Sequence, residues 1–349
     1  MRKREYDEDD VRVRPGKGSR PRTRIRPAHE DAVEGFVVAV DRGRYTTLVE
    51  LERPKGSAQK RKQQQQHRLV VAMKARELGR KGIVVGDRVA LVGDVSGRPD
   101  TLARVVRVEP RTSMLRRSAD DTEDTDGIER PIVANADQLV IVTALADPPP
   151  RPRMIDRILV AAFDAEIDTL LCLTKSDLAP PDELIALYEP LGVQHVVVHK
   201  GGPLEELREH LTGRISVMVG HSGVGKSTLV NVLVPDANRA VSQVNAVTGR
   251  GRHTSTSAVA LELPDGGWII DTPGVRSFGL AHVSVETVLA AFPDLVEGTV
   301  KCPKGCTHLG DGCALDAWAA AGNADPARLE SLRRLLSSRE GTLDEPPST

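Results

Sequence analysis

Residues 220–227 have the types and spacing needed to hold the phosphate chain of a nucleotide. They read Gly-His-Ser-Gly-Val-Gly-Lys-Ser and fit the pattern G-x-x-x-x-G-K-[ST]. An apolar run at 215–219 predicts a strand before them, and the residues from Thr228 onward predict a helix. Backbone N–H groups at the glycines can turn toward the phosphates, Lys226 can reach the β and γ oxygens, and Ser227 can hold Mg²⁺. The predicted phosphate-binding residues are Gly220, His221, Ser222, Gly223, Val224, Gly225, Lys226, Ser227 and Thr228.

A second short motif, Thr174-Lys175-Ser176-Asp177, follows an apolar run at 168–173 that predicts a buried strand. On its own this motif is equally typical of a helix-capping turn. Together with a phosphate loop it resembles the guanine-specificity motif of GTPases, which usually reads Asn-Lys-x-Asp. The Asp177 carboxylate can accept hydrogen bonds from N1–H and N2–H₂ of guanine, and the stem of Lys175 can lie across the base. Thr174 stands where the motif usually has Asn. Its hydroxyl can form hydrogen bonds but lacks the second hydrogen-bonding contact that an amide provides.

The order of the two motifs is reversed relative to ordinary GTPases, in which the phosphate loop comes first. Here the guanine motif precedes the loop, which predicts a circularly permuted GTPase domain. A further apolar run at 138–144 and a helical pattern at 154–167 indicate an α/β domain with a mostly parallel sheet, and such domains bind ligands at the carboxyl ends of their strands. The segment expected to support the base from its other side, around 198–201, shows no clear motif.

The polar stretch at 241–256 occupies the place of switch I, the segment that responds to the γ-phosphate in GTPases. A Thr in this segment completes the Mg²⁺ shell. Thr254 is the first candidate for that role and Thr256 is the second.

Switch II is predicted at the end of a hairpin formed by residues 257–263 and 268–270. The hairpin leads to Asp271-Thr272-Pro273-Gly274, which fits the pattern D-x-x-G. Asp271 is expected to hold Mg²⁺ through water, and the N–H of Gly274 is expected to meet the γ-phosphate. Val275 comes next, where many GTPases carry the Gln that positions the attacking water. We therefore expect slow intrinsic hydrolysis, with another group of the protein or a partner positioning the attacking water.

Three cysteines and a histidine lie close together near the end of the chain. Three thiolates and an imidazole at this spacing predict one structural zinc ion per chain, because four protein ligands leave no open position for catalysis. Unrelated free cysteines are the alternative. Cys172, in contrast, sits alone in an apolar strand and is expected to be inert core. The predicted zinc ligands are Cys302, Cys306, His308 and Cys313.

The whole chain predicts a multidomain protein. Five short β-rich runs at 35–40, 45–49, 68–72, 83–92 and 102–108 are typical of a small barrel of the OB type. The predicted parts are a disordered basic arm (1–33), an N-terminal OB-fold β-barrel (34–117), a central circularly permuted α/β P-loop GTPase domain (118–295), a C-terminal, mainly helical zinc-binding domain (296–340) and a tail (341–349). The arm and the Gln-rich loop at 57–67 are basic, which suits RNA contact and equally suits solvated, flexible chain.

Charge and hydropathy give few constraints on partners. The formal net charge is −1, and the chain begins without the apolar run of a signal peptide. No stretch is long and apolar enough to predict a membrane span. We expect a cytoplasmic monomer.

Taken together, the basic barrel, the permuted GTPase domain and the Cys₃His cluster resemble the RsgA (YjeQ) family over residues 34–338. The most specific segments are 220–228, 251–254, 271–280 and the zinc cluster. The resemblance implies a GTPase of small ribosomal subunit biogenesis that binds the subunit and its rRNA, is stimulated by it, and leaves on GTP hydrolysis. It also implies that His253 in switch I substitutes for the missing Gln. The zinc spacings are about one residue shorter than the family pattern on each side of Cys306-x-His308.

Two other functions fit parts of the sequence. A P-loop ATPase with an accidental Thr-Lys-Ser-Asp would differ in substrate, and competition between ATP and GTP separates it from a GTPase. A ribosome- or RNA-binding factor could use the nucleotide only as a structural ligand, and a single-turnover assay with and without small subunits decides that case. A glycine-rich turn without any ligand is the remaining alternative for residues 220–227, and the flanking strand and helix argue against it.

Overall fold

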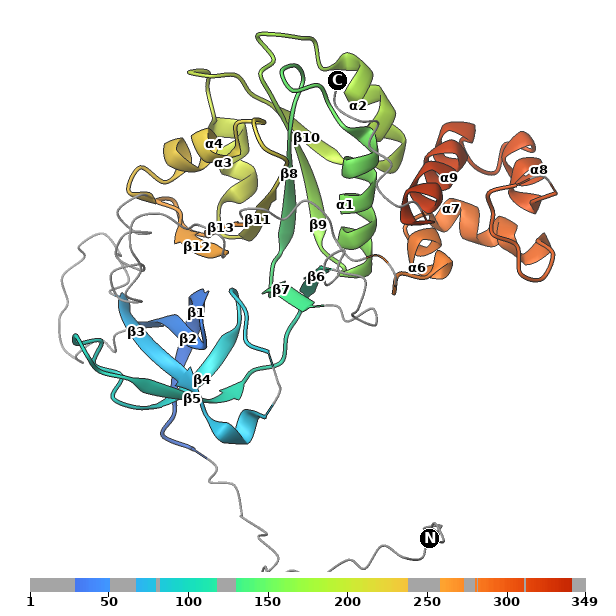
Figure 1. The fold of residues 1–349 in the computed structure, drawn as a ribbon. Helices are drawn as coiled ribbons and strands as arrows, with labels where there is room; N and C mark the ends of the chain where they lie inside the picture. The colour runs from blue at the N-terminus through green and yellow to red at the C-terminus, as the bar shows by residue number, and fades with distance from the viewer. Residues whose placement is uncertain are drawn as a thin grey trace, which may run out of the picture. The chain divides into compact units, whose positions relative to one another are not determined.

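The computed structural model describes residues 29–50, 67–79, 82–117, 130–237, 258–272, 280, 282–310 and 312–340. The chain divides into a unit of Met1–Asp31 and a second unit of Ala32–Thr349, and all the helices and strands below lie in the second (Figure 1). The basic arm up to residue 28, residues 51–66 of the Gln-rich region and the tail from residue 341 are outside the described residues. Among the described helices, none combines the length and the apolar character that crossing a membrane requires.

Five strands form a closed barrel, which confirms the predicted N-terminal architecture. They are β1 (Val33–Asp41), β2 (Arg44–Glu50), β3 (His67–Lys74), β4 (Arg88–Gly93) and β5 (Ala103–Val108). The pairing runs β1–β2–β3–β5–β4 and returns from β4 to β1, with only β3–β5 parallel. Alternate residues point inward and form an apolar core that includes Val37, Val49, Val70, Val89 and Leu91.

The fourth strand begins later than the run at 83–92 predicts. The structure starts β4 at Arg88, because a turn at Gly86 interrupts the extended chain. Gly86 has a φ of 91°, and a Cβ there would lie 2.0 Å from a neighbouring carbonyl oxygen. Asp87 follows with its side chain buried and pairs with Arg111 at 2.7 Å. This turn depends on residues that are distant in the sequence, such as Arg111, so the local pattern of apolar residues does not predict it.

The segment after the barrel contains a short hairpin that the sequence did not suggest. Strand β6 (Met114–Arg117) pairs antiparallel with β7 (Arg130–Ala134). Leu115 and Val133 are buried in this pair. Each strand is too short to show a period of two, so the sequence alone does not indicate either of them.

The GTPase domain is built on a mostly parallel sheet. Its strands, in spatial order, are β10 (Gln194–Val197), β9 (Asp168–Thr174), β8 (Gln138–Ala144), β11 (Ile215–Val219), β13 (Trp268–Asp271) and β12 (Val259–Glu262). Only β12 runs antiparallel to its neighbour in this part of the sheet. All seven residues of β8 are buried, as expected for a central strand covered on both faces.

Helices cover both faces of this sheet (Figure 1). One core contains the buried sides of α1 (Pro152–Asp164) and α2 (Asp182–Tyr188). A second core, on the opposite face, contains those of α3 (Glu205–Leu211) and α4 (Lys226–Leu233). The nucleotide motifs therefore follow the carboxyl ends of adjacent parallel strands.

The C-terminal part is helical, as predicted. It contains α6 (Val285–Ala290), α7 (Pro293–Val296), the 3₁₀ turn η4 (Glu297–Lys301), α8 (Ala314–Ala320) and α9 (Pro326–Glu340). Helix α9 joins the GTPase domain through Arg334, whose Nε lies 3.1 Å from both carboxylate oxygens of Asp156 on α1. Asp156 is only 1% exposed. Burial raises the pKa of Asp156, and the charge of Arg334 counteracts that rise.

We predict that Arg334→Met lowers the free energy of unfolding by about 3–5 kcal/mol, because it leaves a buried carboxylate without its partner. Urea denaturation measures the change. The matched control is Arg88→Met, since the ion pair of Arg88 with Glu34 joins two exposed side chains and is expected to contribute little. Equal destabilisation by the two substitutions would contradict the prediction.

Candidate functional site

The predicted phosphate loop connects the end of β11 to the start of α4. Gly223 and Gly225 have φ values of 86° and 92°, a region that strongly favours glycine. At Gly220 a Cβ would lie 2.4 Å from the carbonyl oxygen of Val142 in β8, so a side chain there would clash with main chain. Val224 is buried and anchors the loop, while Ser222, Gly223, Ser227 and Thr228 are exposed and His221 is half-buried.

The sheet brings Asp271 to this loop, as the D-x-x-G assignment requires. Asp271 ends β13 and pairs in register with Met218, one residue before the end of β11. Its Oδ1 lies 2.6 Å from Nζ of Lys226. The hydroxyl of Thr272 donates to the carbonyl of Met218 at 3.0 Å and holds the chain against β11 just beyond Asp271. A lysine, which can bind phosphate, and a carboxylate, which can act on the associated cation, thus lie next to each other at the phosphate loop.

Thr174 links the guanine motif to the phosphate loop. Its hydroxyl donates to the carbonyl oxygen of Val224 at 2.6 Å and lies 3.2 Å from that of Thr143. The side chain is buried. A hydroxyl has a single proton, so the shorter contact takes it. Thr174 therefore links the guanine motif to the phosphate loop by a hydrogen bond, although it replaces the usual Asn.

We predict that Thr174→Val weakens nucleotide binding by about 1 kcal/mol, roughly fivefold in Kd, because it removes this hydrogen bond without changing the shape of the side chain. Titration with a fluorescent GTP analogue measures the effect. Thr174→Ser keeps the donor and serves as the control. Wild-type affinity in the valine variant would show that the tether is not needed.

A pocket of about 500 Å³ lies beside the loop and contains the predicted base-binding residues. Asp177 and Lys175 line it, together with residues of α4 from Thr228 to Val232. Lys175 also donates to the carbonyl of Asp147. The backbone nitrogen of Ser176 lies 3.4 Å from the carbonyl oxygen of Val198, which ties the motif to the segment that follows β10. The full lining is Thr174, Lys175, Asp177, Leu178, Val198, His199, Lys200, Gly201, Gly202, Leu204, Gly225, Thr228, Leu229 and Val232.

The wall at 198–204 includes the segment around 198–201, which is expected to support the base although its sequence shows no clear motif. It follows β10, a strand of four residues that pairs parallel with β9. The rule that ligands lie at the carboxyl ends of parallel strands was the available signal. Strand β10 itself has no clear apolar pattern, because Val196 is its only buried residue.

The predicted catalytic residues His253, Thr254 and Gly274, together with Thr256 and Val275, lie outside the described residues. The described chain resumes at residue 258, β12 begins at Val259 and β13 ends at Asp271. The hairpin between the two predicted switches is thus as expected, including its turn, where Gly266 and Gly267 have φ values of 90° and 98°.

The four predicted metal ligands converge on one point. Cys302 Sγ lies 3.8 Å from Cys313 Sγ and 3.6 Å from His308 Nδ1. Cys313 Sγ lies 3.5 Å from the same nitrogen, and Cys306 Sγ accepts from the His308 N–H at 3.4 Å. Burial lowers the pKa of His308, which favours the neutral imidazole that binds metals. The four ligand atoms lie within 4.8 Å of one another and could hold a metal ion. The short sequence spacings between the ligands therefore do not prevent them from converging.

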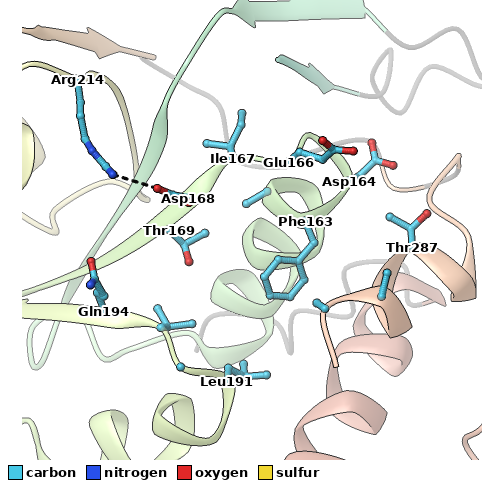
Figure 2. A pocket seen from close by; sticks show the side chains of 15 residues that line it. Phe163, Asp164, Glu166, Ile167, Asp168, Thr169, Leu191, Gln194, Arg214 and Thr287 are labelled. Atoms are coloured by element: carbon cyan, nitrogen blue, oxygen red, sulfur yellow. Dashed lines mark ion pairs between the residues drawn. The ribbon is translucent and has the colours of Figure 1, made fainter. Parts of the chain in front are cut away.

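A larger pocket, of about 840 Å³, lies at the other ends of the strands (Figure 2). The amino ends of β9 and β10, the end of α1 and part of α6 line it. Figure 2 shows Arg214 reaching Asp168, at 3.1 Å, while the ring of Phe163 comes from α1. Because the nucleotide motifs follow the carboxyl ends, this pocket is separate from the predicted nucleotide site.

A closed five-stranded barrel, a GTPase domain with its guanine motif before its phosphate loop, and a Cys₃His cluster define a circularly permuted GTPase. The family model described as RsgA GTPase matches residues 108–281. The small ribosomal subunit biogenesis GTPase RsgA of Pseudomonas fluorescens is 41% identical over 268 residues, which cover 73% of this chain and 75% of that protein. The protein of the same description from Chlorobaculum parvum is 37% identical over 264 residues, which cover 73% of this chain and 85% of the relative.

Solved structures agree with this assignment. YjeQ from Thermotoga maritima matches with a TM-score of 0.60 and 25% identity over 89% of this chain and 99% of that chain. YloQ, described as a circularly permuted GTPase, matches in fold with a TM-score of 0.60 and 21% identity over 90% of this chain and 96% of that chain. The chain belongs to the RsgA GTPase family, and its activity is GTP hydrolysis.

Proposed function

We propose that this GTPase acts in late maturation of the small ribosomal subunit, binds the subunit and its rRNA, and leaves on GTP hydrolysis. The observation that carries the nucleotide part is the arrangement around the phosphate loop. Thr174 ties the guanine motif to one side of the loop, and Asp271 contacts Lys226 at the other. The role on the small subunit is proposed from the relatives, which are described as small ribosomal subunit biogenesis GTPases.

The base, in this proposal, lies in the 500 Å³ pocket. Asp177 accepts from N1–H and N2–H₂ of guanine, and the stem of Lys175 lies across the ring. The residues at 198–204 support the base from the other side. Lys226 and the backbone N–H groups of the loop hold the phosphates.

Mg²⁺ is the proposed cation of the phosphate site. Ser227 and Thr254 are the proposed protein ligands, since each offers a hydroxyl oxygen, a donor of the kind that Mg²⁺ prefers, and the carboxylate of Asp271 holds the ion through water. When bound, the ion neutralises charge on the β and γ oxygens. In this structure Asp271 forms an ion pair with Lys226. When Lys226 binds phosphate instead, the carboxylate of Asp271 is released from that pair and can take its role at the ion.

The attacking water needs a group that Val275 cannot provide. We propose that docking on rRNA orders switch I, which brings His253 toward the water, while the N–H of Gly274 meets the γ-phosphate. Hydrolysis then releases both switches. Because switch II leads into the C-terminal domain, release weakens the hold on RNA. The protein acts as a monomer in this scheme.

A single structural zinc ion is the proposed occupant of the Cys₃His cluster. Tetrahedral coordination at about 2.3 Å for sulfur and about 2.0 Å for nitrogen gives sulfur–sulfur distances of about 3.8 Å and sulfur–nitrogen distances of about 3.5 Å. The distances of 3.8, 3.6 and 3.5 Å among Cys302, Cys313 and His308 support this occupant. Four protein ligands leave no position for substrate.

GTP hydrolysis measured with small subunits, with large subunits and with neither tests the proposed function. We expect slow turnover alone and strong stimulation by small subunits only. Equal rates in the three conditions would contradict a role on the small subunit. Stimulation of ATP hydrolysis instead would indicate a different substrate.

We predict that His253→Ala leaves GTP affinity near normal and lowers small-subunit-stimulated turnover by about two orders of magnitude or more, as expected for loss of a group that acts on the attacking water. Single-turnover hydrolysis with saturating subunits measures the loss. His195→Ala is the control, because His195 is an exposed histidine on β10. Unchanged stimulated turnover in His253→Ala would refute the role assigned to that residue.

A further inference from the structure

Strand β1 belongs to both the barrel and the GTPase sheet. Its first half, from Val33 to Phe36, pairs with β4 and closes the barrel. Further along, Ala39 pairs antiparallel with Val259 of β12. The barrel strands and the GTPase strands therefore form one continuous sheet of eleven strands.

The side chains of β1 also divide between two cores. Val37 lies in the barrel core, whereas Val38 lies in the core shared with α1, and both are at most 2% exposed. Neighbouring residues of a strand point to opposite faces, and the register shift between Val37 and Ala39 marks a bulge that bends the strand here. The strand is thus fixed from both sides.

Contacts with the barrel extend along the hairpin of β12 and β13. The rings of Phe36 and Trp268 have centroids 5.0 Å apart, where β13 begins. His67, at the start of β3, lies 3.9 Å from the carboxylate of Glu262, where β12 ends. At the opposite end of the hairpin, Ala39 faces Val259.

One row of paired residues crosses four strands and contains Asp271. Ala39 of β1 pairs with Val259 of β12, Val259 pairs with Asp271 of β13, and Asp271 pairs with Met218 of β11. Asp271 is therefore separated from the barrel by a single residue across the sheet. Its carboxylate lies 2.6 Å from Lys226, so a small shift of the hairpin changes the geometry at the phosphate site.

We propose that β1 is a positioning element for Asp271, acting through its pairing with β12 and the contact between Phe36 and Trp268. The barrel then sets the phosphate end of the nucleotide site as well as contacting RNA. The metal-binding consequence rests on the function proposed above for Asp271. The structural link does not depend on that role.

Phe36→Leu and Trp268→Leu test the link, with Tyr45→Leu as the control. Tyr45 is a buried aromatic residue of the barrel core and lies outside the contacts with β12 and β13 given above. Amide hydrogen exchange of the peptide spanning 259–271 is expected to become faster in the first two variants and to stay unchanged in Tyr45→Leu. Unchanged exchange in both Phe36→Leu and Trp268→Leu, or equal acceleration in the control, would overturn the proposal.

The consequence for the site is measured by the Mg²⁺ concentration that gives half-maximal binding of a fluorescent GTP analogue. We expect an increase of about twofold to tenfold in Phe36→Leu and Trp268→Leu, the range that corresponds to a lost aromatic pair, and none in Tyr45→Leu. Faster exchange at 259–271 with no change in Mg²⁺ dependence would overturn the positioning of Asp271. If Asp271→Asn itself leaves the Mg²⁺ dependence unchanged, the cation role in the proposed function fails, and hydrogen exchange still decides the link.

Discussion

Asp177→Asn is expected to weaken GTP binding by about 3–6 kcal/mol, roughly 10²- to 10⁴-fold in Kd, because the negative charge is lost and the amide, which keeps one acceptor for N1–H, places an N–H₂ donor against the N2–H₂ of guanine. The new amide can donate to an oxygen at position 2 of the base. Xanthine carries such an oxygen in place of the amino group, so XTP is expected to bind the variant better than GTP. Competition of GTP, XTP and ATP for one labelled nucleotide measures the preference.

The control for this change is Asp182→Asn. Asp182 lies in the first turn of α2, outside the residues that line the base pocket, and its replacement removes the same charge. Wild-type preference is expected there. If Asp177→Asn binds GTP as tightly as the wild type, the pocket reads the base in another way.

Loss of one metal ligand, in Cys306→Ser, is expected to release the zinc and unfold the segment around it. Structural zinc in small zinc-binding peptides stabilises the fold by about 10–16 kcal/mol, which is comparable to or larger than the whole free energy of unfolding of a typical domain. Metal content should fall well below one ion per chain. The fluorescence of Trp318 should change as well, because its indole donates to the carbonyl oxygen of Asp294 and packs against Gly298 in η4, the turn that leads into Cys302.

Cys172→Ala separates metal loss from the general effect of removing a thiol. Cys172 is fully buried in β9, and burial raises its pKa to about 12, so it is an inert thiol remote from metal chemistry. We expect one zinc per chain in this variant. Trp268→Phe in both variants isolates the signal of Trp318, since the chain has two tryptophans. Full zinc content in Cys306→Ser would refute the ligand set.

Local patterns were sufficient for much of the site. The phosphate loop is predictable because strand, glycines and helix are adjacent in sequence, and the metal cluster because its four ligands lie between Cys302 and Cys313. The tether made by Thr174 was not predictable, since its acceptor on Val224 is 50 residues away. The pocket wall at 198–204 follows a strand of only four residues, β10, and such a short strand has no clear pattern in the sequence.

The fold shows the same division. The five barrel strands and the central strand β8 follow from apolar runs. The turn at Gly86 does not, because it is imposed by a neighbouring main chain and by Asp87 with Arg111. The pairing of Ala39 with Val259 joins residues that are distant in the chain, and period-two patterns do not specify which edge a strand pairs with.

The pairings of β1 with β4 and with β12 also affect how the protein is made. During synthesis the barrel strands emerge first and can close on themselves through β1 and β4. The same edge of β1, beyond Phe36, receives β12 only after the GTPase domain has been almost completely translated. Until then it presents unpaired N–H and C=O groups, which are a template for pairing with other chains. Chains truncated before residue 258 are therefore expected to self-associate, even though their barrel is complete.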